Sequence, residues 1–279
     1  MAYRSLLSVI YDDAHDNAQI AAAAMLARRF DAHLELLCLG IDEMQVGYYF
    51  AAADAVLHQT SLAMAREKAQ TLLERCKAAM AAEDIRWSAQ AVVAQMGALN
   101  EVVGQAALFS DLVVQPMPLT QGSGPVGVAV TEAALFSARA PVLLLPESGL
   151  PQGFPRRAVI GWNGGVEAVN AVRAALPALQ LAGTASVAMV DPPVRPGAQS
   201  SPGQSLAAML DRHGVKADIS LLPKTRTRIS EVLLQHAKDQ DADLFVAGAY
   251  GHSRFREAIL GGVTREMMAH ADIALLMAH

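Results

Sequence analysis

The sequence predicts an α/β protein made of two tandem doubly wound domains. Each domain is expected to hold a five-stranded parallel sheet, in the strand order 3-2-1-4-5, flanked by helices. Short apolar runs alternate with helix-like stretches, which is typical of parallel βαβ units. The length of 279 residues fits two domains of about 100–150 residues each. The chain also repeats itself at a displacement of 132 residues, where residues 111–114 fall on 243–246 and residues 140–145 fall on 272–277.

Each half is predicted to run strand, helix, strand, helix, strand, helix, strand, helix, strand. In the first half the strands are expected at 5–10, 34–40, 86–93, 111–115 and 142–146, with helices at 16–30, 57–81, 98–109 and 127–137. In the second half the strands are expected at 157–161, 185–190, 216–222, 243–247 and 273–277, with helices at 166–180, 204–213, 228–240 and 262–270. Asp16 is a suitable N-cap for the first helix.

Domain boundaries follow from the repeat and from turn residues. Residues 5–10 match 157–160 at a different displacement, so the connecting loops differ in length. The stretch 146–155 contains three prolines and two glycines, which suits a linker. We therefore expect domains at 1–147 and 156–279, joined by a linker at 148–155.

Composition excludes several classes of function. Hydrophobic residues make up 53% of the chain and charged residues 18%, which supplies apolar material for two cores. A net charge of −5 gives no footprint for binding nucleic acid or a membrane surface. The sequence has no apolar run of about 18 residues and no signal peptide at its start, so we expect a cytoplasmic protein. Cys38 reads as a buried core residue and Cys76 as part of a helix, and two cysteines so far apart predict neither a disulfide framework nor a zinc site.

The strongest candidate site lies near the C-terminus. The apolar run Asp243-Leu-Phe-Val-Ala-Gly248-Ala-Tyr-Gly251 is followed after nine residues by Gly261-Gly262-Val263-Thr264 and then by a second apolar run. Glycine lets backbone N–H groups approach an oxyanion, and a helix N-terminus offers unbonded N–H groups and the positive end of its dipole. The pattern predicts a phosphate cradle. A second loop, 161–165, follows the first strand of this half and would face the cradle if the two strands are neighbours.

These residues resemble those of a tandem universal stress protein, with two UspA-type domains in one chain. The nucleotide motif of that family is Gly, two residues, Gly, nine residues, Gly, and then Ser or Thr. Gly248, Gly251 and Gly261 fall at these spacings, whereas Gly262 departs from the hydroxyl residue. The resemblance implies that the backbone N–H groups of these four glycines hold phosphates. Val263 and Thr264 would begin the helix, with the Thr264 hydroxyl partly replacing the missing one.

The resemblance also implies a nucleoside site. The loop that contains Gly161 and Trp162 carries Asn163 where the family usually has Asp, and Asn163 can still hydrogen-bond a ribose hydroxyl. Val190 matches a position that packs beside adenine. We therefore expect ATP, with or without Mg²⁺, to bind in the second half, and no metal site made by protein side chains.

The first half is expected to have lost the standard nucleotide site. At the displacement of 132 residues the motif positions are occupied by Pro116, Leu119, Ala129 and Val130. Proline has no N–H to donate, and the larger side chains would crowd a phosphate. This half would then serve packing or a different ligand.

Three kinds of function follow from these features. The first is a nucleotide-binding sensor or regulator of a stress response, without chemistry of its own. The second is a weak ATPase or nucleotide hydrolase, although the chain has no phosphate loop ending in Lys and Ser or Thr, no nucleophile elbow and no catalytic residue that we can assign. The third is an interaction protein whose sites are both vestigial.

Two further expectations concern charge and assembly. Arg254, Arg256 and Arg265 gather around the glycines with His252, which suits either a bound anion or a solvated surface. The family commonly pairs domains through their last strands, which are residues 142–145 and 273–277 here. One chain can form that pair internally as a pseudo-dimer, and two chains can pair further as a homodimer.

Overall fold

The computed structural model describes residues 2–12, 16–42, 53–119, 124–192, 203–249 and 262–279. Contacts between residues divide the chain into two compact units. The N-terminal unit contains Tyr3–Pro116 and Gly124–Ala140, and the C-terminal unit is built chiefly from Pro141–His279. Each unit is described by itself below.

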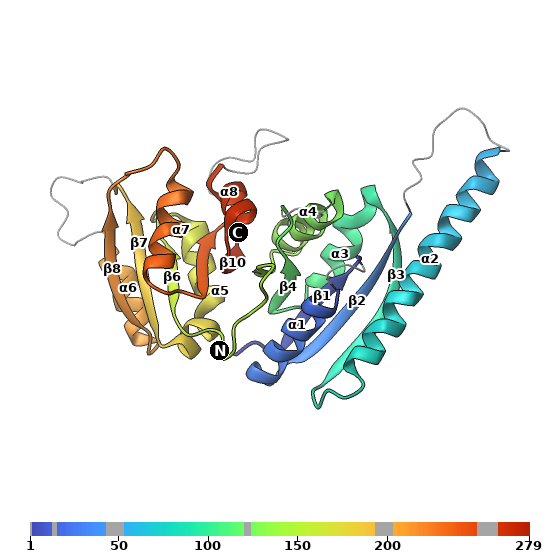
Figure 1. The fold of residues 1–279 in the computed structure, drawn as a ribbon, viewed down its shortest axis with the longest axis horizontal. Helices are drawn as coiled ribbons and strands as arrows, with labels where there is room; N and C mark the ends of the chain where they lie inside the picture. Colours follow the sequence, from blue (N-terminus) through green and yellow to red (C-terminus); the bar gives the residue numbers. More distant parts are fainter. Residues whose placement is uncertain (1, 13–15, 43–52, 120–123, 193–202, 250–261) are drawn as a thin grey trace. The chain divides into compact units, whose positions relative to one another are not determined.

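The N-terminal unit is a parallel sheet covered by helices on both faces (Figure 1). Its strands are ordered β3-β2-β1-β4, with α1 packed against α2 and α3 against α4. Leu6, Leu7, Val9 and Ile10 are all buried, because a parallel strand covered on both faces has no polar side. The elements are β1 (Ser5–Ile10), α1 (Asp16–Phe30), β2 (His33–Asp42), α2 (Ala53–Met80), β3 (Trp87–Gln95), α3 (Leu99–Ala107), β4 (Leu112–Pro116) and α4 (Pro125–Glu132), with a 3-10 turn at Met96–Ala98 and a π-helical turn at Ala133–Ser137.

The C-terminal unit repeats this arrangement and has two more strands, β5 and β10. Its sheet is ordered β5-β10-β9-β6-β7-β8, and all neighbours are parallel except β5 and β10. Within this sheet α5 packs on β6, β7, β9 and β10, while α7 packs on α8. The elements are β5 (Val142–Leu145), β6 (Ala158–Gly161), α5 (Val166–Ala182), β7 (Thr184–Val190), α6 (Gln204–Arg212), β8 (Lys216–Leu222), α7 (Ile229–Asp239), β9 (Leu244–Gly248), α8 (Gly262–His270) and β10 (Ala274–Ala278).

The predicted fold class, doubly wound α/β, is confirmed by the mainly parallel strand pairing and by the helices that alternate with the strands. One strand is grouped differently from the sequence halves. β5 lies in the C-terminal unit because it runs antiparallel to β10, with Leu144 opposite Leu275 and Val142 opposite Met277. The expected pairing of the two last strands is therefore present, while the domain boundaries at 147 and 156 remain a prediction from the repeat.

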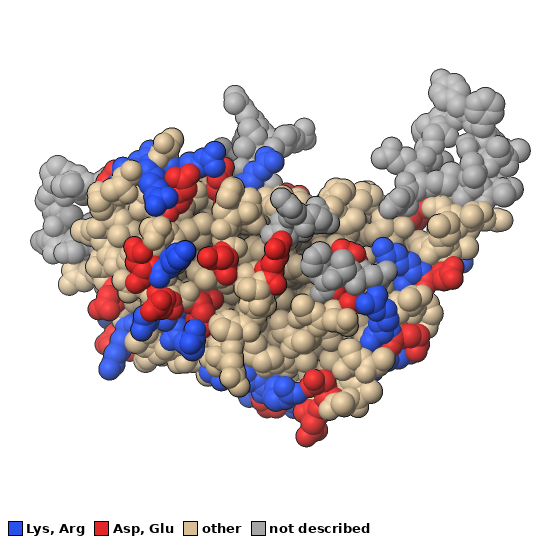
Figure 2. Space-filling model, in the orientation of Figure 1, with Lys and Arg blue, Asp and Glu red and all other residues tan. Residues whose placement is uncertain are grey.

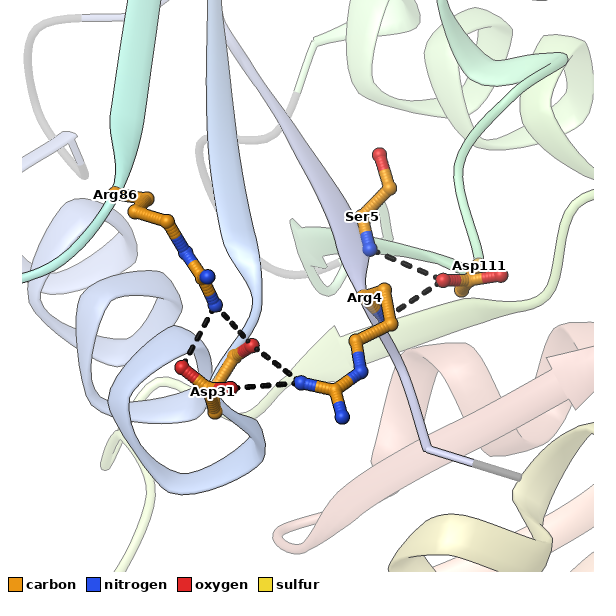
Figure 3. Close-up of polar contacts among 5 residues, drawn as sticks. All are labelled: Arg4, Ser5, Asp31, Arg86 and Asp111. Carbon is orange, nitrogen blue, oxygen red and sulfur yellow. Dashed lines mark hydrogen bonds and ion pairs between the residues drawn. The ribbon is translucent and has the colours of Figure 1, made fainter.

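An aspartate anchors the start of β1 (Figure 3). Asp111 Oδ2 accepts hydrogen bonds from the backbone N–H groups of Arg4 and Ser5, at 2.7 and 3.0 Å. The Arg4 side chain turns to Asp31, which also accepts from Arg86, and both ion pairs measure 2.7 Å. These exposed ion pairs add little stability. The hydrogen bonds from backbone N–H groups to Asp111 are therefore the main polar contacts that hold the start of β1.

The C-terminal unit uses the same device. Asp243 precedes β9 as Asp111 precedes β4, and Asp243 Oδ1 accepts from the backbone N–H groups of Arg156 and Arg157 at 2.9 and 3.1 Å. In both units one carboxylate thus satisfies the two N–H groups at the entry to the first strand. The repeat seen in the sequence extends to this side-chain contact.

Charges of both signs lie interspersed on the face shown in Figure 2. This distribution fits the modest net charge of −5 and shows no strong separation of sign on that face. Among the described helices, none is both long and apolar enough to cross a membrane.

Candidate functional site

The two loops of the candidate site begin at adjoining strand ends. β6 lies between β7 and β9, with Gly161 opposite Ala188 on one side and Ala247 on the other. The chain leaves β6 through α5 toward β7, whereas β9 lies on the opposite side of β6. This is the topological switch point at which open α/β sheets bind ligands. The sequence analysis expected the two loops to face each other if these two strands are neighbours, and β6 and β9 are neighbours.

Gly248 ends β9 at a point where the backbone of α5 comes very close. A Cβ built on Gly248 would lie 2.6 Å from both Ala168 N and Glu167 C. Real Cβ atoms do not approach backbone atoms so closely, so only glycine fits without a shift of the helix. Gly161 is also shielded, since its Cβ would lie 3.1 Å from the Phe245 ring. Packing alone therefore explains glycine at position 248, and it makes position 161 tight for a larger residue.

The first turn of α8 faces a different environment. A Cβ on Gly262 would meet no described atom within 4 Å, and Val263 is 39% exposed while Thr264 is buried. The first N–H groups of an α-helix have no intrahelical acceptor, so those of residues 262–264 are available to an anion. Gly251 and Gly261, the other two glycines of the predicted cradle, lie outside the described residues.

Asn163 is already engaged with its own loop. Its Oδ1 accepts a hydrogen bond of 2.8 Å from Gly165 N, which shapes the turn that leads into α5. The side chain is exposed, and its Nδ2 donors and the second lone pair of Oδ1 remain for a ligand. Trp162 continues the sheet by donating its N–H to Ala188 O at 2.9 Å, and Val190 ends β7 partly exposed.

Charge differs between the two helix starts. Glu167 lies in the first turn of α5, where a carboxylate interacts favourably with the helix dipole. Arg265 lies exposed in the first turn of α8, where a cation opposes the dipole unless an anion binds nearby. Glu266 forms an ion pair of 2.6 Å with Arg228, which is the residue that precedes α7. An anionic group is therefore favoured at α8 and disfavoured at α5. Arg254, Arg256 and His252 lie outside the described residues.

Two residues that the sequence reasoning did not assign hold the chain just after Gly248. The His279 ring contacts Ala249 O through Nδ1 at 3.0 Å, and Asn170 Nδ2 donates to His279 O at 3.5 Å. Ala249 N also donates to Ala278 O at 2.8 Å. The position of His279 in the sequence could have predicted this contact. A residue just after the last strand lies at the same edge of the sheet as the residues that follow β9.

The corresponding region of the N-terminal unit is built differently. There α4 begins at Pro125, so Ala129 and Val130 lie inside the helix rather than at its start. Backbone N–H groups at such positions are used within the helix. Val130 is fully buried, and Pro116 ends β4 without an N–H to donate. Leu119 is partly buried and lies outside regular structure.

No group of three or more His, Cys, Asp or Glu side chains within the described residues is placed to hold a metal ion. The only carboxylate on the first turn of α5 is that of Glu167, whose Oε2 lies near Gly165. A divalent cation usually needs more ligands than one carboxylate, unless a nucleotide brings its own phosphate oxygens.

Comparison with known proteins agrees with this architecture. Residues 156–279 match the model of the Universal stress protein family. No curated protein matches the sequence significantly. A solved universal stress protein from Archaeoglobus fulgidus DSM 4304 has a TM-score of 0.73 at 12% identity, covering 98% of this chain and 95% of that one.

Two further structures are similar. A putative universal stress protein from Pseudomonas aeruginosa UCBPP-PA14 has a TM-score of 0.58 at 17% identity, covering 99% of this chain and 93% of that one. A universal stress protein from Archaeoglobus fulgidus in complex with dAMP covers 52% of this chain and 98% of its own, at 14% identity and a TM-score of 0.33. The structures from Archaeoglobus fulgidus DSM 4304 and from Pseudomonas aeruginosa show that the whole chain has the fold of universal stress proteins.

Proposed function

We propose that this chain is a tandem universal stress protein that binds ATP in its second half and acts as a cytoplasmic sensor or regulator of a stress response. The observation that carries the proposal is the position of α8. Its exposed first turn, at Gly262 and Val263, follows the glycine-spaced segment after β9. That segment starts beside the end of β6, at the switch point of a domain that matches the family model.

In the proposed complex the phosphates lie against the first turn of α8. The N–H groups of Gly262, Val263 and Thr264 donate to phosphate oxygens, together with those of Gly251 and Gly261. Arg265 supplies a positive charge on the same turn. Gly248 contributes mainly by letting α5 approach β9, because its glycine character already follows from that contact.

The nucleoside occupies the other side of the switch point. The loop of Gly161, Trp162 and Asn163 borders the ribose, and Asn163 offers its amide donors to a ribose hydroxyl. Val190, partly exposed at the end of β7, gives the base an apolar contact. Glu167 keeps the phosphates away from the start of α5, since two negative charges repel each other there.

The proposal assigns one nucleotide to each chain. In the N-terminal unit the N–H groups at Ala129 and Val130 are internal to α4, so the equivalent donors are missing. Mg²⁺, if it accompanies the nucleotide, is held mainly by phosphate oxygens and water, because the described residues offer no cluster of ligands. The role is therefore binding, with the paired last strands serving as an internal pseudo-dimer.

The test is isothermal titration of the full chain with ATP, with and without Mg²⁺. Pro is tolerated at the first position of a helix but lacks an N–H, so Gly262→Pro removes one donor while keeping α8. Gly262→Ala is the matched control, which keeps the donor. Wild type and Gly262→Ala should bind one ATP per chain, and Gly262→Pro should bind about 10-fold more weakly, the value of one hydrogen bond to a charged group.

Either of two results would reject the proposal. One is no heat and no thermal shift with any adenine nucleotide for wild type. The other is equal binding by Gly262→Pro and Gly262→Ala. A stoichiometry of two ATP per chain would leave the second half as a site but overturn the assignment of one nucleotide per chain.

A second candidate is an interaction protein that binds no nucleotide. It is favoured by the side chain of Asn163, whose oxygen is used by Gly165, and by Gly248, which packing explains. It predicts that protein purified under native conditions carries no nucleotide after denaturation and mass spectrometry. Recovery of stoichiometric adenine nucleotide would exclude it.

A further inference from the structure

Two cysteines that are far apart in the sequence lie in contact inside the N-terminal unit. Cys38 lies in β2 and Cys76 lies near the end of α2, and their sulfur atoms are 3.5 Å apart. Both side chains are fully buried, and both are free thiols. The nucleotide site proposed above uses neither residue.

The close packing of α2 on β2 brings the two sulfurs together. α2 turns one face to the sheet, on which Ala65, Ala69 and Cys76 are buried. Opposite this face, a Cβ on Gly40 would lie only 1.9 Å from Ala65 O, so the helix approaches the strand as closely as a glycine permits. Figure 1 shows α2 running along β2 and β3. Cys38 is therefore covered directly by the helix that carries Cys76.

The two thiols have different acidities. The Cys38 thiol donates a hydrogen bond to Cys76 Sγ, and this bond lowers the pKa of Cys76. Burial and the nearby charge of Asp16 act in the opposite direction, and Arg75 adds a smaller lowering effect. The same contact, with burial, raises the pKa of Cys38. Since the thiolate is the nucleophile, Cys76 is the residue that reacts first.

We propose that Cys38 and Cys76 form a modification site at which a hydroperoxide converts the two thiols to a reversible disulfide between β2 and α2. The Cys76 thiolate attacks the distal peroxide oxygen and becomes a sulfenic acid, and the leaving alkoxide or hydroxide takes up the thiol proton. Cys38 sulfur then attacks the Cys76 sulfur, and the sulfenic oxygen leaves as water. Two electrons pass from the thiols to the peroxide, and the products are a disulfide, an alcohol or water, and water.

This bond requires a movement of the two sulfur atoms and access for the oxidant. A disulfide joins its sulfurs at about 2.05 Å, so the two sulfur atoms must approach each other by about 1.5 Å. Local opening of α2 from the sheet must admit the oxidant, because neither thiol is exposed. The covalent bond would then hold α2 against β2 until a thiol reductant reopens it.

The test treats the reduced, folded full-length protein with hydrogen peroxide and follows intact mass and free thiols. We expect the mass to fall by about 2 Da and both thiols to be lost together. A peptide map without reductant should show one cross-linked pair containing Cys38 and Cys76. Dithiothreitol should restore both the mass and the thiols.

Matched variants separate the two steps. In Cys38→Ser, Cys76 should accumulate a sulfenic acid that dimedone traps, and in Cys76→Ser, Cys38 should remain largely unreacted. If either variant fails to fold, the intact mass of the peroxide-treated wild-type protein tests the proposal by itself. Four results would overturn the proposal: two free thiols after peroxide has oxidised methionines, separate sulfinic acids, disulfides between chains, or a bond that forms only after denaturation.

Discussion

Gly248 and Gly262 belong to one glycine-spaced motif, but the structure gives them opposite responses to the same substitution. In Gly248→Ala the new methyl group would lie 2.6 Å from Ala168 N and Glu167 C, both backbone atoms. Ordinary contact requires about 3.4 Å or more, so the first turn of α5 must move away by about 0.8 Å. Overpacking of this kind costs about 1–3 kcal/mol.

Gly262→Ala is the matched control. No described atom lies within 4 Å of its new Cβ, and alanine is favoured over glycine in a helix by up to about 1 kcal/mol. We therefore expect the free energies of unfolding of the two variants to differ by about 1–4 kcal/mol, with Gly248→Ala the less stable.

Urea unfolding without nucleotide measures this difference. With a slope of about 1–3 kcal/mol per molar urea, the midpoint for Gly248→Ala should fall by about 1 M relative to Gly262→Ala. Hydrogen exchange should show the loss of protection concentrated in α5. Equal midpoints for the two variants would refute the packing explanation, and glycine at position 248 would then need a ligand to account for it.

Three further predictions follow from other contacts. Asp243→Ala should destabilise the protein by about 3 kcal/mol in urea unfolding, because the buried carboxylate accepts two backbone N–H groups, and Asp111→Ala should cost less because Asp111 is exposed. Burial lowers the pKa of His236, so its neutral form stabilises the fold above about pH 6.5, and this stability is lost as the pH falls through the lower folded pKa; His236→Gln should flatten the change in urea midpoint between pH 7 and pH 5. Gln115→Met should leave the unfolding midpoint unchanged or higher, because Nε2 of this buried side chain has no partner in the described structure, and a loss above about 1 kcal/mol would show that it does.

Much of the fold could be predicted from local pattern. β1, β8 and α1 have the predicted bounds, because apolar runs and helix-like stretches leave direct marks in the sequence. α2 begins at Ala53 rather than at 57, and the predicted helix 127–137 is α4 from Pro125 followed by a π-helical turn. Such differences lie at element ends, where neighbouring packing decides how far a helix continues.

The candidate site was predictable only in part. Residue spacing located the loops after β6 and β9, but it could not distinguish a glycine that admits a phosphate from one that admits a helix, as at Gly248. It also could not reveal that the Asn163 oxygen is used by Gly165, or that His279 contacts Ala249. The proximity of Cys38 and Cys76 depends on how α2 crosses β2, which no short-range pattern encodes.

The pairing of β5 with β10 has a practical consequence for dividing this chain. A protein cut within residues 148–155 would separate β5 from the sheet to which it bonds, leaving Leu275, Leu276 and Met277 on an uncovered edge. An unprotected apolar edge strand recruits another strand. The isolated segment 156–279 should therefore self-associate, whereas a segment that starts at Pro141 would keep β5 paired with β10 and leave these three residues covered.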